Sequence, residues 1–323
     1  MRKIAFFTTL FFGILLLFAV HCEKPVKRIF YINSYHEGYA PSDTILLAIQ
    51  QKIVTRSDFV LKIFFLDAYN HPQEQFLLKK AKEAVEAIKA FDPHVLIASD
   101  DPAVKYVVAP YFTKGPIPVV FCGVNWTCKQ YGLPTGWVTG ILEVLPIESL
   151  MLAIQPSYPA IREVFILSGN TPSERKNARM VESVFREMGY VPETEAVSNF
   201  DIWKQFFQAA NASADMIFLL SNEGVGEWND TEAYEFVFRT IQKPVVTCEE
   251  SMMRYAVFGV TKVEREQGEW AIQTALEILG GKSPIDIPVL YGKAVKYFLN
   301  PVLADKIEFK PDPMLLKKVQ EVH

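Results

Sequence analysis

Short apolar runs alternate along the chain with longer segments in which apolar residues recur at every third or fourth position. Residues 28–32, 61–66, 95–98 and 118–121 are short apolar runs that predict four strands. Between the second and third of them, residues 76–91 carry an apolar stripe opposite Lys and Glu, which predicts an amphipathic helix lying on a sheet. Strands that alternate with helices in this way indicate βαβ units and a mainly parallel sheet.

The same pattern restarts in the second half of the chain. Residues 163–167 predict a strand, and a helix begins after it with Thr171 as N-cap, Pro172 in the first turn and Glu174 as the third residue of a capping box. The next strand, helix and strand are predicted at 216–220, 231–241 and 244–247. Two βαβ sheets in tandem fit this pattern better than one very large sheet.

No low-complexity linker separates the two halves, which join near residues 139–146. After the second sheet come a helical pattern at 264–279, a Gly280-Gly281 stop and a strand-like run at 295–299. This additional βα unit predicts that the chain returns to the first lobe, and discontinuous lobes joined by several strands form a hinge. We expect the first lobe to comprise residues 27–142 and 250–284, and the second lobe residues 143–249 and 285–320.

The N-terminal segment has the pattern of a secretory signal. Met1, Arg2 and Lys3 precede an uncharged stretch at 4–20 that is rich in Phe, Leu and Ile. A retained transmembrane anchor is the alternative, although this stretch is short for crossing a bilayer. The residues up to Cys22 resemble the cleavage box of bacterial lipoproteins, so the signal is expected at 1–22, with either lipidation of Cys22 or simple release.

Charge and cysteine content exclude several classes of protein. A net charge of −4 provides no basic field for a nucleic-acid partner. The spacing of Cys122, Cys128 and Cys248 matches no zinc pattern, and the five histidines are scattered, so no metal site is expected. Cys122 and Cys128 either form a short-loop disulfide in an oxidising compartment or stay single buried thiols.

Polar side chains follow every predicted strand. Because ligands of open parallel sheets bind beyond the carboxyl ends of the strands, facing lobes would bring these side chains to one cleft, with Tyr35 and Trp126 as aromatic walls. The six strand ends lie at residues 33–36, 99–101, 123–126, 168–170, 221–223 and 249–251. Their charged residues are all acidic: Asp100, Asp101, Glu223, Glu249 and Glu250. A buried carboxylate needs a partner, so the ligand is expected to carry an amine or other cationic group.

Two alternatives compete with a ligand site. Polar residues after a strand also cap the next helix, as Asp101 and Asn170 would do ahead of Pro102 and Thr171. The loop at 221–224 comes well before a cap predicted at Asp230, so it is free to contact a ligand. A hydrolase or isomerase is the other alternative, but the chain lacks nucleophile-elbow, zinc-protease and phosphate-loop motifs, so no catalytic residue is assigned.

The segment Tyr31-Ile32-Asn33-Ser34-Tyr35-His36-Glu37-Gly38-Tyr39-Ala40-Pro41-Ser42-Asp43 resembles the opening of the ABC-transporter substrate-binding family that includes tryptophan- and tyrosine-type binding proteins. The likeness continues through 98–103, 118–125, 298–300 and Ala304. The resemblance implies an α/β fold of the periplasmic-binding-protein type I class. Two Rossmann-like lobes with parallel sheets would then be joined by a hinge, with a ligand in the cleft and no cofactor.

By position, the resemblance implies that the ligand contacts are Tyr35, His36, Ser99, Asp100, Asn125, Ser168, Asn170, Asn222 and Glu223. The first loop lacks the Trp expected before Ser42, so an aromatic amino acid is not assigned as ligand. The expected function is that of a monomeric, extracytoplasmic solute-binding protein. It would deliver a small amine-bearing, amino-acid-like molecule to an ABC transporter permease by hinge closure. A subunit of the same fold that senses a ligand and signals to a membrane kinase is the alternative.

Overall fold

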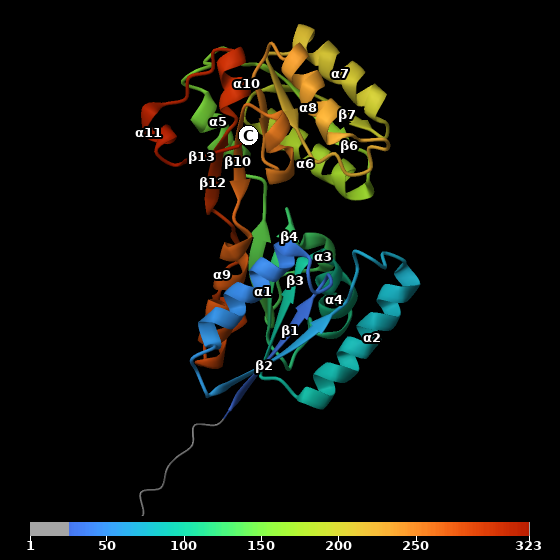
Figure 1. Cartoon of the computed structure of the whole chain (residues 1–323). Helices are drawn as coiled ribbons and strands as arrows, with labels where there is room; N and C mark the ends of the chain where they lie inside the picture. The colour runs from blue at the N-terminus through green and yellow to red at the C-terminus, as the bar shows by residue number, and fades with distance from the viewer. Residues whose placement is uncertain (1–25, 323) are drawn as a thin grey trace, which may run out of the picture.

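The computed structural model describes residues 26–322, which form two α/β lobes joined by a narrow neck (Figure 1). The predicted signal at 1–22 and its Cys22 lie outside the described residues. Two separate sheets, each covered by helices, confirm the expected fold class. Within the described part of the chain, no helix has the length and apolar character needed to cross a bilayer.

The first lobe, lower in Figure 1, is built on a six-stranded parallel sheet with the order β11-β5-β4-β3-β1-β2. Its strands are β1 (Lys27–Asn33), β2 (Phe59–Phe65), β3 (Val95–Ser99), β4 (Val119–Asn125), β5 (Val138–Glu143) and β11 (Leu290–Tyr291). Its α-helices are α1 (Ala40–Ile53), α2 (Glu74–Phe91), α3 (Asp100–Ala103), α4 (Ala109–Tyr111) and α9 (Glu264–Leu279). A π-helical turn, Val104–Val108, joins α3 to α4.

The alternation of side chains along β1 explains the layers of this lobe. Phe30 and Ile32 pack with the buried face of α2, whereas Ile29 and Tyr31 pack with α1 and α9 on the other face. A strand buried on both faces reads as a continuous apolar run, as the sequence of β1 does.

The second lobe contains a seven-stranded sheet with the order β13-β12-β10-β9-β8-β6-β7, in which only the β10–β12 pair is antiparallel. Its strands are β6 (Glu163–Gly169), β7 (Val191–Val197), β8 (Met216–Leu219), β9 (Val245–Thr247), β10 (Phe258–Lys262), β12 (Val295–Leu299) and β13 (Val319–Glu321). Its α-helices are α5 (Ile147–Ile154), α6 (Pro172–Glu187), α7 (Phe200–Ser213), α8 (Asp230–Thr240), α10 (Pro301–Lys306) and α11 (Pro313–Leu316). Side chains from both of its faces form one apolar core cluster.

The chain crosses between the lobes after β5, after β10 and after β11. The crossings differ from the expected boundaries at residues 250 and 285. β10 pairs with β9 in the second sheet, so the return to the first lobe begins with α9, and β11 pairs with β5 before the last crossing. Three crossing segments close together form the hinge that the sequence predicted in general terms.

Two local predictions were tested by the capping geometry. Thr171 Oγ1 accepts a hydrogen bond from the Glu174 backbone N–H at 3.1 Å, which confirms the predicted start of α6. The predicted cap of α8 at Asp230 is wrong, because Asn229 accepts from the Glu232 N–H at 3.0 Å and Asp230 is the first helical residue.

The three described cysteines are free and buried. Cys122 lies in β4, and Cys128 donates a hydrogen bond through Sγ to the Leu133 carbonyl oxygen at 3.3 Å. Of the two alternatives that the sequence left open, the structure shows single buried thiols.

Candidate functional site

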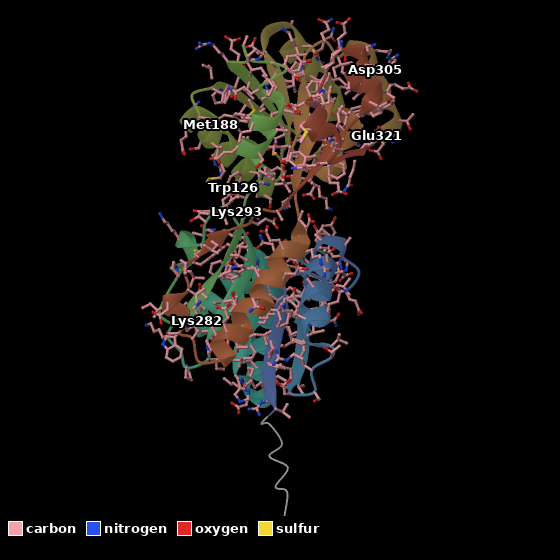
Figure 2. The ribbon with its side chains drawn as sticks, turned by 90° about the vertical axis from the view of Figure 1, so that its left-hand side faces the viewer. Trp126, Met188, Lys282, Lys293, Asp305 and Glu321 are labelled. Atoms are coloured by element: carbon pink, nitrogen blue, oxygen red, sulfur yellow. The ribbon has the colours of Figure 1, made fainter. Side chains whose placement is uncertain are left out.

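The three hinge segments enclose a cavity of about 710 Å³ at the lobe junction. Its walls include Glu143 at the end of β5, Lys262 and Gln267 at the second crossing, and Lys293 at the third. Trp126 also lines it, and Figure 2 shows Trp126 and Lys293 at the level where the two lobes meet. None of the nine predicted contact residues lines this cavity; those residues belong to the strand ends, which meet at the same junction.

Asp100 combines an unfavourable backbone conformation with a buried carboxylate. It follows β3 directly, adopts a left-handed backbone with φ 68°, and its Oδ2 atom is buried without a hydrogen-bond partner among the described residues. Gly123 leaves room for it, since a Cβ there would lie 2.7 Å from Asp100 Oδ1. Burial and the nearby Glu143 carboxylate raise the pKa of Asp100 well above its usual value. Strain and an unpaired charge together mark functional sites.

Asp101 does not cap a helix, contrary to one reading of the sequence. Its Oδ2 accepts from the Asn125 backbone N–H at 3.1 Å and from Asn125 Nδ2 at 3.0 Å, and its Oδ1 accepts from the Tyr131 hydroxyl at 2.6 Å. Lys176 of the second lobe lies 3.8 Å from the same Oδ1. Asp101 therefore orders the strand-end loop of the first lobe and contacts the opposite lobe.

A chain of hydrogen bonds crosses the junction from Trp126 to α6. Trp126 Nε1 donates to Asn177 Oδ1 at 3.0 Å, and Asn177 Nδ2 donates to Glu174 Oε1 at 3.1 Å. Glu174 is only 4% exposed, and its Oε2 has no hydrogen-bond partner in the described part of the chain. Burial, together with the carboxylates of Glu249 and Glu223, raises the pKa of Glu174 to about 7.

Lys262, the last residue of β10, forms an ion pair with Glu143 at the end of β5. Burial opposes the charge of Lys262, but the carboxylates of Glu143 and Glu249 outweigh burial and hold its pKa above the usual value. Burial also raises the pKa of Glu249, and the charge of Lys262 partly offsets this increase. The charge of Lys262 is thus already balanced by carboxylates of the protein.

We call six carboxylates at the junction the acidic cluster: Asp100, Asp101 and Glu143 from the first lobe, and Glu174, Glu223 and Glu249 from the second. Their cationic neighbours are Lys176 and Lys262. Among residues 26–322, no group of three or more His, Cys, Asp or Glu side chains is placed to hold a metal ion.

Aromatic rings of the first lobe lie beside the acidic cluster. The ring centroids of Tyr35 and Tyr39 are 4.6 Å apart, those of Tyr39 and Tyr69 are 5.2 Å apart, and His36 lies 6.0 Å from both Tyr39 and Tyr69. Burial and the Asp100 carboxylate raise the pKa of Tyr35, and burial and Glu223 of the opposite lobe raise that of Tyr39. The rings therefore face the junction from the first lobe.

Three predicted contact residues are occupied inside their own lobes. Ser99 is fully buried with its Oγ 2.8 Å from the Tyr31 hydroxyl, and Ser168 donates to the Gly169 carbonyl oxygen at 3.0 Å. Asn170 donates to Ser198 Oγ at 2.8 Å and accepts from Arg175 at 2.7 Å. These side chains shape the strand ends, and their role as ligand contacts stays a prediction.

The remaining predicted residues of the second lobe, Asn222 and Glu223, lie in the loop after β8. Asn222 is half-buried and Glu223 is exposed. This loop packs closely on the end of β6, because a Cβ on Gly169 would lie 2.1 Å from the Glu223 carbonyl oxygen. The loop is therefore held in place by its backbone, which leaves both side chains available at the junction.

Several residues of the junction were not predicted from the sequence, among them Glu143, Glu174 and Lys262. Glu174 was interpreted only as a capping-box residue, and Glu143 fell in the segment interpreted as a join. Lys262 ends a strand that the pattern did not reveal. A charged residue directly after the apolar pair Ile141-Leu142 was the available signal for Glu143, whereas Thr261 separates Lys262 from the apolar residues before it.

Residues 67–323 match a family model described as ABC transporter substrate binding protein. No curated protein matches the chain. Among solved structures, a ligand-free, open substrate-binding protein with adhesive properties from Clostridium difficile has a TM-score of 0.72 at 12% identity, covering 92% of this chain and 99% of that one.

Two ligand complexes are also similar. An ABC domain with bound L-Trp from Streptococcus pneumonia has a TM-score of 0.61 at 17% identity, covering 92% of this chain and 100% of that one. A solute-binding protein of an ABC transporter from Rhodopseudomonas palustris, in complex with 3,4-dihydroxybenzoic acid, has a TM-score of 0.56 at 14% identity, covering 81% and 83%. At these identities the likeness shows the fold alone, two lobes of the periplasmic-binding-protein type I class.

Proposed function

The chain belongs to the ABC transporter substrate-binding protein family, and on that premise we propose that it binds a small amine-bearing, amino-acid-like molecule and delivers it to a transporter permease. The proposal includes export through the segment 1–22, retention at the membrane through a lipid on Cys22, and action as a monomer without catalysis.

The observation that carries the ligand class is the charge of the lobe junction. Six carboxylates of the acidic cluster face two lysines, and one of these, Lys262, is paired with Glu143. Desolvated carboxylates without counterions are costly, and a bound cation removes that cost. An ammonium group donates to several acceptors at once and so fits Asp100 and its neighbours.

The aromatic rings of Tyr35, Tyr39 and Tyr69 support the amino-acid-like part of the proposal. They provide a mainly apolar wall beside the carboxylates, and aromatic faces also attract cations. A ligand with an ammonium group and an apolar or aromatic body fits both features.

Closure follows from the distribution of charge over the two lobes. Asp100 lies on one lobe, and Glu174, Glu223 and Glu249 lie on the other, so the carboxylates that Lys176 and Lys262 do not pair repel one another across the junction of the empty protein. A cation between them reverses the sign of this interaction, and the three crossing segments allow the lobes to rotate. The permease would then recognise the closed form.

A thermal-shift screen tests the proposal. Amino acids, simple amines, nucleosides, small peptides and amine-free carboxylic acids are added to the purified protein. An amine at about a hundred times its dissociation constant should add about 2.7 kcal/mol to the free energy of unfolding, a shift of several degrees. Stabilisation by amine-free acids alone, or by no compound, would contradict the proposed ligand class.

A further inference from the structure

From two buried carboxylates on opposite lobes, each with one oxygen that has no hydrogen-bond partner among the described residues, we propose that the ligand carries two separate cationic groups, one held by Asp100 and the other by Glu174. This inference rests on the proposed function and narrows the ligand to diamines and dibasic amino acids. The positions of both carboxylates are unfavourable in the ligand-free protein, and a bound cation at each would remove that cost.

Glu174 does not form the hydrogen bond that its position in a capping box offers. In a capping box the third residue returns its carboxylate to the backbone N–H of the cap. Here Thr171 makes its half of the box, but the Glu174 carboxylate turns inward to Asn177. Its Oε2 is buried without a hydrogen-bond partner among the described residues. The inward position is explained if a ligand supplies the missing donor.

The position of the Asp100 carboxylate is also unfavourable in the ligand-free protein. A left-handed backbone is unfavourable for a residue with a Cβ, and Gly123 lacks a side chain where one would collide with the Asp100 carboxylate. Gly123 is fixed in turn, because its N–H donates to Gln267 Oε1 at 2.9 Å. Three features of the first lobe thus position a carboxylate whose Oδ2 has no partner among the described residues.

The lysines of the junction leave these two carboxylates unpaired. Lys262 forms its ion pair with Glu143, and Lys176 lies closest to Asp101. The charges that act on Glu174 are the carboxylates of Glu249 and Glu223, which raise its pKa by repelling its charge. Because Asp100 and Glu174 belong to different lobes, one cation for each lobe balances the charges and links the lobes on closure.

The test compares linear α,ω-diamines of increasing chain length with monoamines of the same carbon number by isothermal titration calorimetry. The expected result is one optimal length at which the diamine binds at least about 30-fold more tightly than its monoamine, the size of effect seen for a desolvated charge pair. Asp100→Asn and Glu174→Gln should each abolish this preference. Glu182→Gln, which replaces a partly exposed carboxylate on the same helix as Glu174 but outside the cavity lining, is the matched control and should preserve it.

The outcomes separate this inference from the proposed function. Monoamines that bind as tightly as diamines would overturn the two-cation inference, because one ammonium would then bridge both carboxylates, while the proposed amine ligand would stand. A diamine preference that survives both substitutions would also overturn it. Failure of every amine to bind would overturn the proposed ligand class as well. Near-ultraviolet circular dichroism of each variant verifies that the fold is retained.

Discussion

Replacing Glu174 with glutamine should stabilise the ligand-free protein at alkaline pH. The pKa of Glu174 is about 7 in the folded protein, against 4.5 for an unperturbed glutamate. The folded state therefore binds this proton more tightly than the unfolded state, and the free energy of unfolding falls as pH rises between these two values. A difference of about 2.5 in pKa corresponds to about 3 kcal/mol. Glutamine is neutral at every pH and keeps a carbonyl oxygen as acceptor for Asn177, so the free energy of unfolding of the variant should not fall in this way as the pH rises.

The assay is thermal or urea unfolding of both proteins from about pH 4 to about pH 9. The two should be equally stable at the acid end, and Glu174→Gln should gain about 3 kcal/mol at the alkaline end, a rise of several degrees in Tm. Glu182→Gln, the control on the same helix but outside the cavity lining, should follow the wild type throughout. Identical pH profiles for Glu174→Gln and the wild type would refute the reasoning, because they would show that the buried carboxylate carries no cost. The affinity for an amine should change in the opposite direction, falling on acidification because the proton competes with the ligand.

Three further substitutions test the junction and the export of the protein. Gly123→Ala forces alanine into a positive φ and places a methyl group against the Asp100 carboxylate. It should lower the free energy of unfolding in urea by about 1–3 kcal/mol and weaken amine binding. Unchanged stability and affinity would contradict the claim that Gly123 makes room for the Asp100 carboxylate. Lys262→Met should lower the free energy of unfolding by about 3 kcal/mol because Glu143 loses its partner, and adding Glu143→Leu should restore most of that loss. If the single and double variants are equally stable, the ion pair does not contribute to stability. Cys22→Ala should move the protein from the membrane fraction to the soluble extracytoplasmic fraction, and a wild-type protein that is already soluble would disprove the lipid anchor.

The layers of the fold could be predicted because long periodic segments have one interpretation. The stripe at residues 76–91 could only be an amphipathic helix, and α2 spans Glu74–Phe91. β7 was missed because it is an edge strand whose side chains are mostly half-buried or exposed, and its Pro and three charged or polar residues hide any alternation. β10 is a five-residue strand with Gly259 as its second residue and Thr261-Lys262 at its end, and without it the second crossing was placed too early.

The general location of the site could be predicted, but its charge pairs could not. The rule that ligands meet the carboxyl ends of strands identified Asp100, Asn222 and Glu223. The sequence could not show that Glu174 abandons its capping position, because this depends on the space beside Asn177 and on the lobe opposite. Nor could it show that Ser99 and Ser168 turn inward, since a strand-end serine has the same sequence context in either orientation.

The measurement that tests the central claim most directly is small-angle X-ray scattering of the purified protein, without ligand and saturated with the tightest-binding amine from the titration series. The account predicts a smaller radius of gyration with the amine, as the two lobes close about the hinge, and no change for Asp100→Asn at the same concentration. An amine that saturates the protein while its radius of gyration stays constant would contradict the claim that ligand charge closes the lobes.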